Sequence, residues 1–323
     1  MKRLLSVVSF FLIFLVVSAQ VKTIEYAQRD TCKLYMDVYN PKGQSDGMCV
    51  IYAFGGAFKM GDKTDKVTVS YMEKLSQNGI TAIAINYRLG MKGDAYELKG
   101  MKLLNRYADA IRMATEDMLT ASRYVNDHAL ELGVDPNKIV LSGSSAGAMT
   151  ALQCDFELSN NTQLGQIMPD GFRLAGVVTF AGAVSVLNGK IEYKKAPAPT
   201  LFFHGTEDAL VPYNKISMFG KGMYGSAALA KIFKKHEYPF GIIRYEHFGH
   251  EIASIPLHET ISEILRFLDT YVRDRKAANF DLTIHETAVT KPMLNFSIRS
   301  INKMQEIKIS KEAQSRMSGG ESR

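Results

Sequence analysis

Short, continuous apolar runs alternate with helical segments along most of this chain, and this alternation constrains its fold more than any other feature. Each run is rich in β-forming residues and ends at glycine or a polar turn, as is typical of strands buried on both faces. Because parallel strands need crossover helices between them, the sequence predicts an α/β fold with a doubly wound, mostly parallel sheet. The expected strands lie in 47–56, 80–90, 138–143, 174–183, 198–205 and 240–249, and the expected helices in 70–79, 107–132, 146–158, 225–239 and 258–276.

The two ends of the pattern differ from its middle. Residues 21–28 and 32–41 alternate apolar and polar side chains, which predicts an antiparallel hairpin at one edge of the sheet. The compact domain is expected to span residues 20–276, a length that suits a single α/β domain. Residues 277–323 contain two further alternating pieces and a polar end, so we expect a short C-terminal appendage of one or two strands.

Residues 1–19 have the features of a signal peptide. Lys2 and Arg3 precede a run of apolar residues, and Val17-Ser18-Ala19 form a small-x-small cleavage site. The apolar run is short for a membrane anchor, which needs about 20 residues. We therefore expect an exported protein, periplasmic or secreted, with no membrane span after cleavage.

Charge and cysteine content argue against two classes of function. The formal net charge is +6, and removing the two charges of Lys2 and Arg3 leaves +4. No lysine- or arginine-rich run resembles a nucleic-acid-binding surface. The spacing of Cys32, Cys49 and Cys154 fits no metal site, so we interpret all three as small buried hydrophobic residues.

The segment IVLSGSSAGAMTAL carries the candidate nucleophile. It places the pattern G-x-S-x-G between an expected strand and an expected helix. Only Ser145 has glycine both two residues before it and two after it, at Gly143 and Gly147, whereas Ser142 and Ser144 do not. A turn this sharp brings strand and helix so close that side chains at those two positions would collide. The sequence therefore predicts Ser145 at the apex, beside a helix N-terminus that favours a developing oxyanion; the alternative is an ordinary Gly/Ser turn.

A serine nucleophile needs a base and an orienting carboxylate, which are expected after later strands with the acid first in the chain. Asp208 is the candidate acid, because the apolar residues after it would anchor its loop, and Glu207 is the alternative. His250 follows Gly249 in a loop that can turn back over the sheet edge, and it is the candidate base. His247 is the alternative base.

The other histidines are interpreted as structural. His204 lies inside an apolar strand end, where it would satisfy backbone groups. The remaining four are expected on helices or in the tail, away from the reactive edge of the sheet; they are His128, His236, His258 and His285.

The segment IYAFGGAFKMGD predicts an oxyanion hole. The residues after the expected strand of this segment have minimal side chains, which would let the backbone approach a substrate. The N–H groups of Gly56 and Ala57, with that of Ala146, are therefore the candidate donors. The alternative is an ordinary glycine turn.

With these parts in order, the sequence resembles the α/β-hydrolase fold esterases, and it looks most similar to exported bacterial carboxylesterases that include acetyl xylan and feruloyl esterases. The resemblance covers residues 22–276 and rests on VYNP, YAFGGAF, INYRLG, GVDPNKIVLSGSSAGA, FFHGTEDALVPY and HFGHE. One departure is Phe54 where many lipases and esterases have the histidine of an HGGG motif, with Ala57 at its last glycine. The fold also implies that Cys32 and Cys49 lie at opposite ends of the sheet without a bridge.

The resemblance implies a serine esterase that acts by two-step acyl transfer and needs neither metal nor organic cofactor. Its expected substrate is a small-molecule or polysaccharide-borne ester with an acetyl or hydroxycinnamoyl group. The alternatives are a catalytically inactive binding protein, a serine peptidase or a lipase on the same fold. The oligomeric state is not predicted. Segments 91–107 and 213–227 are expected to shape the substrate pocket, and their Met, Phe and Tyr residues are equally compatible with ordinary packing.

Overall fold

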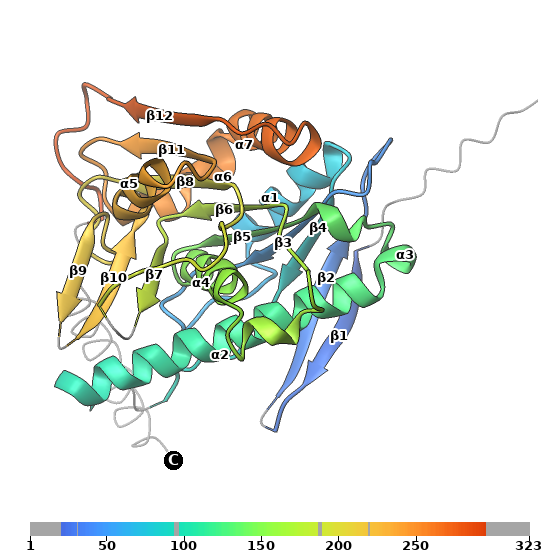
Figure 1. The fold of residues 1–323 in the computed structure, drawn as a ribbon, viewed down its shortest axis with the longest axis horizontal. Helices are drawn as coiled ribbons and strands as arrows, with labels where there is room; N and C mark the ends of the chain where they lie inside the picture. The colour runs from blue at the N-terminus through green and yellow to red at the C-terminus, as the bar shows by residue number, and fades with distance from the viewer. Residues whose placement is uncertain (1–20, 31, 94–96, 187–188, 219, 295–323) are drawn as a thin grey trace, which may run out of the picture.

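In the described part of the chain, nine strands form one large sheet whose middle is entirely parallel (Figure 1). The computed structural model describes residues 21–30, 32–93, 97–186, 189–218 and 220–294. The strand order is β1-β2-β4-β3-β5-β6-β8-β11-β12. The bounds are β1 Lys22–Gln28, β2 Lys33–Tyr39, β3 Cys49–Ala53, β4 Thr81–Ile85, β5 Ile139–Ser144, β6 Gly176–Phe180, β8 Thr200–Gly205, β11 Phe240–Tyr245 and β12 Asn279–Ile284.

The antiparallel edge is present as expected. β1 pairs antiparallel with β2, and β2 pairs antiparallel with β4. Because Tyr39 aligns with Ala82 and Cys49 aligns with Thr81 on the two sides of β4, the end of β2 and the start of β3 lie at the same end of the sheet. Cys32, just before β2, is therefore at the opposite end of the sheet from Cys49. Cys49 and Cys154 are buried, whereas Cys32 is half-buried, so the prediction of three buried thiols is wrong for Cys32.

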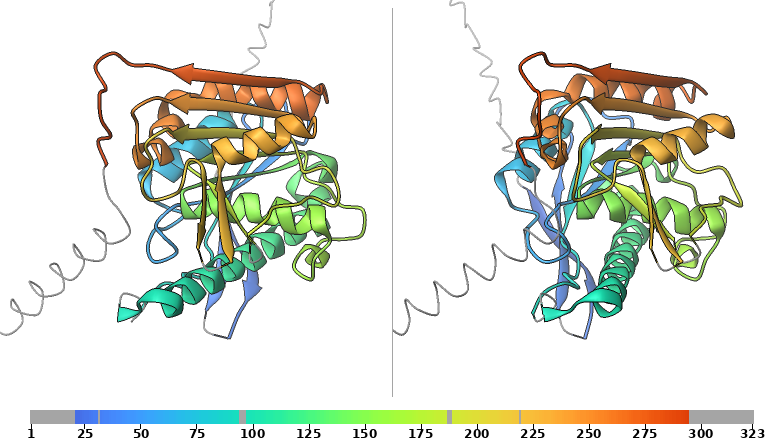
Figure 2. Two further views of the ribbon diagram at one scale, coloured as in Figure 1. Left: turned by 60° about the vertical axis from the view of Figure 1, so that its left-hand side comes forward. Right: turned by 90° about the vertical axis from the view of Figure 1, so that its left-hand side faces the viewer.

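Helices cover both faces of the sheet. α2, α4 and α5 lie on one face, and α1, α6 and α7 lie on the other (Figures 1 and 2). The expected helix at 107–132 begins earlier, at Gly100, and divides near His128. The helix bounds are α1 Lys66–Gln77, α2 Gly100–Asp127, α3 Ala129–Leu132, α4 Ala146–Asn160, α5 Ser226–Lys235, α6 Ile255–Glu259 and α7 Ile261–Phe267, the last continued by a π-helical turn, Leu268–Arg273. In the described ranges, no helix combines the length and apolarity needed to cross a bilayer.

Local sequence signals set the helix ends. Asp65 caps α1, because its carboxylate accepts a hydrogen bond from the Thr68 N–H at 2.9 Å. Gly79 follows this helix with φ +77°, as expected for a glycine that ends a helix in the left-handed conformation.

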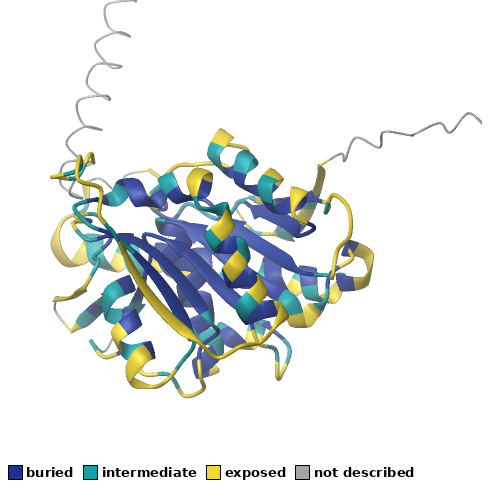
Figure 3. Ribbon diagram, turned by 90° about the horizontal axis from the view of Figure 1, so that it is seen from above, coloured by how far each residue is buried: buried dark blue, intermediate teal, exposed yellow. Residues whose placement is uncertain are grey.

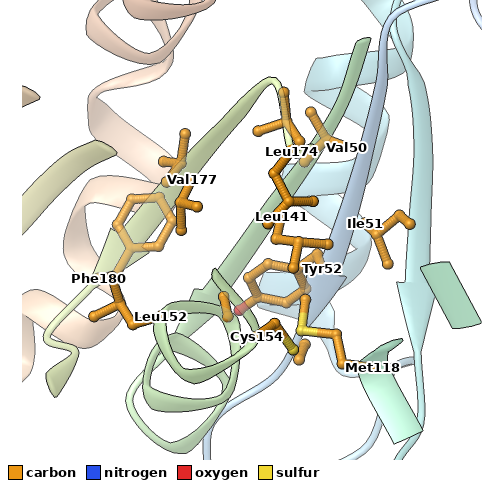
Figure 4. Close-up of a cluster of buried hydrophobic side chains, with 14 of the residues drawn as sticks. Val50, Ile51, Tyr52, Met118, Leu141, Leu152, Cys154, Leu174, Val177 and Phe180 are labelled. Atoms are coloured by element: carbon orange, nitrogen blue, oxygen red, sulfur yellow. The ribbon is translucent and has the colours of Figure 1, made fainter. Parts of the chain in front are cut away.

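The core lies on both faces of the central strands. Seen from above in Figure 3, the middle of the sheet is buried while the outer faces of the helices are exposed. β3 and β5 contribute Tyr52 and Leu141, which pack with Met118 of α2 and Cys154 of α4 in the cluster of Figure 4. This packing fixes α4 against the sheet, and α4 is the helix that starts directly after the candidate nucleophile.

A second, three-stranded antiparallel sheet was not predicted. β7 (Ala183–Val186), β10 (Lys221–Gly225) and β9 (Lys215–Met218) pair in that order and stand beside the main sheet (Figure 2). Residues 213–227, for which the sequence predicted no strand, thus contain the β9–β10 hairpin. Lys221 Nζ donates to Asn105 Oδ1 of α2 at 2.7 Å, so the two segments expected to shape the pocket do meet.

The C-terminal extension contributes to the main sheet. β12 pairs in parallel with β11 over six residues and forms one outer edge of the main sheet. The first alternating piece of the extension is therefore a strand, as expected. The second piece lies at 294–301, of which only residue 294 is among the described residues, and the expected signal peptide lies outside them.

Candidate active site

Ser145 occupies the sharp bend between β5 and α4. Its φ of 50° and ψ of −115° are unusual for a residue other than glycine, and they place it at the N-terminal cap of a 15-residue helix. Two backbone hydrogen bonds hold this bend: the Ser145 N–H donates to the Phe180 carbonyl at 2.8 Å, and the Ser145 carbonyl accepts from the Met149 N–H at 2.9 Å. The bend directs the hydroxyl away from the packed sheet.

The two glycines of the motif are required for close packing. A Cβ on Gly143 would lie 2.2 Å from the carbonyl carbon of Gly147. A Cβ on Gly147 would lie 2.0 Å from the carbonyl oxygen of Ala53, at the end of β3. No side chain fits at either distance, so the steric argument made from the sequence holds at both positions.

Ser145, His250 and Asp208 form one hydrogen-bonded chain. Ser145 Oγ lies 2.8 Å from His250 Nε2, and His250 Nδ1 lies 2.8 Å from Asp208 Oδ2. Since a carboxylate only accepts hydrogen bonds, Nδ1 carries the ring proton and Nε2 is left to accept the serine proton. This is the tautomer that a general base beside a serine needs.

The surroundings of Asp208 keep it ionised. Burial acts to raise the pKa of its carboxyl group, but hydrogen bonds from His204 and His250 outweigh burial and hold this pKa well below its usual value. The other oxygen, Oδ1, accepts from the backbone N–H groups of Leu210 and Val211 at 2.9 and 3.0 Å. The apolar residues after Asp208 therefore anchor its loop through their backbone.

His204 has a larger part than the sequence suggested. Its Nε2 lies 3.3 Å from the Val211 carbonyl, as expected of a histidine that satisfies backbone, and also 3.3 Å from Asp208 Oδ2. Its Nδ1 lies 2.7 Å from Ser226 Oγ. A buried polar residue inside an apolar strand was the only signal available, and it did not reveal the carboxylate partner.

Glu207 and His247, the alternative acid and base, pair with each other instead. His247 Nδ1 lies 2.8 Å from Glu207 Oε1, and both side chains are exposed to solvent. No hydrogen bond joins either of them to Ser145 among the described residues. The structure therefore brings Asp208 and His250 to the serine, and not their neighbours.

The loop after β3 lies against the nucleophile. A Cβ on Gly55 would approach the Cβ of Ser145 to 3.1 Å. Within the described residues, the N–H groups of Gly56, Ala57 and Ala146 meet no acceptor, so all three remain available as donors. The Gly56 carbonyl accepts from the N–H groups of residues 59 and 60, which holds the loop in a tight turn.

Phe54 stands at the position of the histidine in an HGGG motif and makes a different contact. It is buried and stacks on Tyr87, with ring centroids 4.7 Å apart. The Tyr87 hydroxyl donates to the carbonyl oxygen of Phe54 itself at 2.7 Å. Tyr87, which belongs to the INYRLG segment, thus fixes the start of the oxyanion loop without the histidine.

Two residues that support the base were also missed. Ser144 Oγ donates to the Ala253 carbonyl at 2.6 Å, in the 3₁₀ helix His250–Ala253. Glu251 is buried, and its carboxylate accepts from the Gly249 N–H at 2.9 Å and from the N–H groups of Met293 and Leu294 at 3.1 and 3.2 Å. Sequence gave no signal for either contact, because both join segments far apart in the chain.

The sheet order, the flanking helices and the serine on its strand–turn–helix bend define the α/β-hydrolase fold. A solved structure described as a thermophilic esterase, Est2 of Thermogutta terrifontis, aligns with a TM-score of 0.55 over 77% of this chain and 91% of that chain. Its sequence identity is 21%, so the likeness establishes the fold.

The chain belongs to the BD-FAE family, whose model matches residues 36–198, half of its length. That range contains Ser145 and the expected oxyanion loop and ends before Asp208 and His250. The assignment of the last two residues therefore rests on the geometry described above.

Curated relatives match a shorter segment. The fumonisin B1 esterase of Sphingopyxis macrogoltabida is 31% identical over 120 residues, 36% of this chain and 21% of that protein. Lipase 1 of Geotrichum candidum is 29% identical over 126 residues, again 36% of this chain and 21% of the relative. The para-nitrobenzyl esterase of Bacillus subtilis is 29% identical over 38% of this chain and 24% of its own length. The match thus spans about a fifth to a quarter of these relatives.

Proposed function

We propose that this protein is a serine esterase that hydrolyses carboxylic esters. The observation that carries the proposal is the chain of hydrogen bonds from Ser145 Oγ through His250 to Asp208, each 2.8 Å long. Relatives named as esterases and lipases support the same class of reaction.

The geometry supports two-step acyl transfer. Ser145 Oγ attacks the ester carbonyl while His250 Nε2 accepts its proton, and ionised Asp208 stabilises the resulting imidazolium. The tetrahedral oxyanion is stabilised by the N–H groups of Gly56, Ala57 and Ala146, and one such donor is typically worth about 3 kcal/mol. The imidazolium then protonates the leaving alcohol. Water attacks the acyl-enzyme by the same route, which restores the serine hydroxyl.

For the substrate we propose acetyl or hydroxycinnamoyl esters borne by carbohydrates. Three apolar side chains are exposed in segments that follow the carboxyl ends of main-sheet strands: Met60 after β3, Met101 at the start of α2 after β4, and Ile216 in β9 after β8. Such side chains suit an acyl group with apolar surface better than a charged one. The expected signal peptide supports export to a compartment where polysaccharide esters are met.

A Ser145→Ala variant tests the proposed nucleophile. Without the hydroxyl no acyl-enzyme forms, so kcat for p-nitrophenyl acetate is expected to fall by about 10⁴-fold or more. Ser142→Ala is the matched control, because Ser142 is a buried serine of the same strand that contacts Tyr71 and not His250. Unchanged turnover in Ser145→Ala would refute the assignment.

A substrate panel separates the related activities. The proposal predicts turnover of p-nitrophenyl acetate and of methyl ferulate or acetylated xylan, with much weaker activity on p-nitrophenyl laurate and on peptide amides. Preference for the laurate ester would indicate a lipase, and comparable amide hydrolysis a peptidase. No turnover of any ester would favour a binding protein with an inactive site.

A further inference from the structure

A second cluster of titratable side chains lies where β11 and β12 end. Glu246 and His247 follow β11, and His285 follows β12. The two strands are parallel with Tyr245 aligned to Ile284, and the Glu246 N–H donates to the Ile284 carbonyl at 3.0 Å. The three side chains therefore leave the same edge of the sheet. The expectation that His285 lies away from this edge is wrong, because β12 joins the sheet in parallel.

The donor atoms of the cluster are close enough to share one metal ion. One ligand atom from each of Glu246, His247 and His285 lies within 4.8 Å of those from the other two. His285 Nδ1 is 2.7 Å from Glu246 Oε2, and the two imidazole rings are 6.2 Å apart between centroids. Ligands of a tetrahedral zinc ion, each about 2.0–2.2 Å from the metal, lie roughly 3.5 Å apart. All three side chains are partly exposed, so small rotations are enough to reach this spacing.

One ring nitrogen of His247 is already held by a carboxylate outside the cluster. Its Nδ1 is held by Glu207 Oε1 at 2.8 Å, and its backbone N–H donates to Thr206 Oγ1 at 3.1 Å. Its φ of 62° lies in the left-handed region, so the backbone of the turn presents this ring. Metal-binding histidines usually donate their other ring N–H to a carboxylate in this way, which leaves Nε2 for the metal.

We propose that Glu246, His247 and His285 bind one zinc ion, with Glu207 orienting His247 and a water molecule as fourth ligand. Two imidazoles and one carboxylate suit zinc better than calcium or magnesium, which prefer all-oxygen sites. The ion fastens the end of the C-terminal strand to the turn that precedes His250. The proposed zinc ion is separate from the reacting groups, because His250 is already hydrogen-bonded to Ser145 and Asp208.

Titration calorimetry with zinc on untagged, chelator-treated protein tests the site. We expect one ion bound per chain, with affinity reduced at least about 100-fold in His285→Gln and in His247→Ala. Glu207→Gln is expected to weaken binding by about 10- to 100-fold, as for the outer partner of a ligating histidine. His258→Ala is the matched control, since His258 is an exposed histidine on α6. Zinc is also expected to raise the melting temperature of the unmodified protein and of the control, and not that of His285→Gln.

Three results would overturn the proposal: no stoichiometric binding by the unmodified protein, equal affinity in His285→Gln, or an equal loss in His258→Ala. If the unmodified protein shows no stoichiometric binding, the cluster consists of two exposed, hydrogen-bonded His–Glu pairs. Melting temperatures without metal show whether each variant is folded, and His285→Gln keeps a polar side chain at an exposed position for this reason.

Discussion

Ser145 has a backbone conformation that its surroundings impose. A residue other than glycine at φ 50° and ψ −115° is strained by about 1–3 kcal/mol. The packing of Gly143 and Gly147 against their neighbours, and the hydrogen bonds to Phe180 and Met149, leave the bend no other arrangement. The hydroxyl is thus held beside His250 before any substrate arrives, which lowers the entropic cost of the reaction.

A Gly147→Ala variant tests this steric constraint. The new methyl group would lie 2.0 Å from the Ala53 carbonyl oxygen, so β3 and α4 must separate. We expect a loss of about 2–4 kcal/mol in the free energy of unfolding, and a fall in kcat of at least about 100-fold because Ser145 moves.

The control for this prediction is Gly133→Ala. Gly133 also has a positive φ, 64°, but a Cβ there meets no atom within 4 Å. It is expected to cost only about 1 kcal/mol and to leave kcat unchanged. Equal effects of the two substitutions in urea unfolding and esterase assays would contradict the steric explanation.

The residues that could be predicted from sequence share a local signal. Ser145 and its glycines lie within five consecutive residues. The collision that requires glycine at position 143 is decided within that turn, whereas the collision at position 147 is with the end of β3. Asp208 and His250 follow from chain order and from the strand that each follows. The contact between His204 and Asp208 could not be predicted, because only the folded loop brings the two side chains together.

At the scale of elements, the loops after β8 and β11 are joined along their length. The Thr206 N–H donates to the Tyr245 carbonyl and the Glu207 N–H to the Phe248 carbonyl, both at 2.9 Å. A Cβ on Gly205 would lie 2.3 Å from the Gly249 carbonyl oxygen. The acid and the base are therefore carried by one rigid unit, to which residues 293–294 are bound through Glu251.

A Glu251→Ala variant tests the coupling of the extension to the base. It leaves three backbone N–H groups without their acceptor, including that of Gly249, which precedes His250. We expect a loss of about 2–4 kcal/mol in the free energy of unfolding and about a tenfold fall in kcat. Glu251→Gln keeps one acceptor oxygen, so its effects should be smaller.

Urea unfolding and p-nitrophenyl acetate hydrolysis provide both readouts, with Glu259→Ala, an exposed glutamate of α6, as the control. If Glu251→Ala matched this control in stability and rate, the carboxylate would have no role in holding the loop.

Element boundaries and pairings were the less predictable part of the fold. The central strands were found because continuous apolar runs have few other interpretations in an α/β pattern. The β9–β10 hairpin was missed because its strands are only four and five residues long and glycine interrupts the pattern of KGMYG. The position of His285 was wrong because its strand pairs with a segment almost 40 residues earlier, and no local pattern specifies that partner.

At the scale of the whole molecule, one buried carboxyl group is not balanced by a cation. Among the residues that the structure describes, Asp155 of α4 accepts hydrogen bonds only from the Ala198 N–H, at 3.1 and 3.2 Å. Burial raises the pKa of its carboxyl group, the Ala198 N–H and the more distant Arg173 offset this only in part, and the resulting pKa is about 7. The folded protein therefore holds a proton that the unfolded chain, with an aspartate pKa of about 3.9, has already released.

The pH dependence of stability follows from this difference. Between about pH 4 and pH 7 the folded state binds more protons at Asp155, so its contribution to the free energy of unfolding falls as pH rises, by on the order of 4 kcal/mol in total. In Asp155→Asn this decline is expected to disappear. The decline is measured by urea unfolding, as the difference in the free energy of unfolding between pH 5 and pH 8. Asp170→Asn, at an exposed aspartate, is the control. Parallel curves for the unmodified protein and Asp155→Asn would contradict the assignment.

The fold as a whole brings together one hydroxyl, one imidazole and one carboxylate that are spread over 105 residues of the chain. Covalent labelling tests that claim most directly. The protein is incubated with the organophosphate paraoxon, and the modified peptide is identified by mass spectrometry. The account predicts a single diethylphosphoryl group on Ser145, formed at least about a thousandfold more slowly in His250→Ala. Labelling of another residue, or equal labelling of Ser145 without His250, would contradict it.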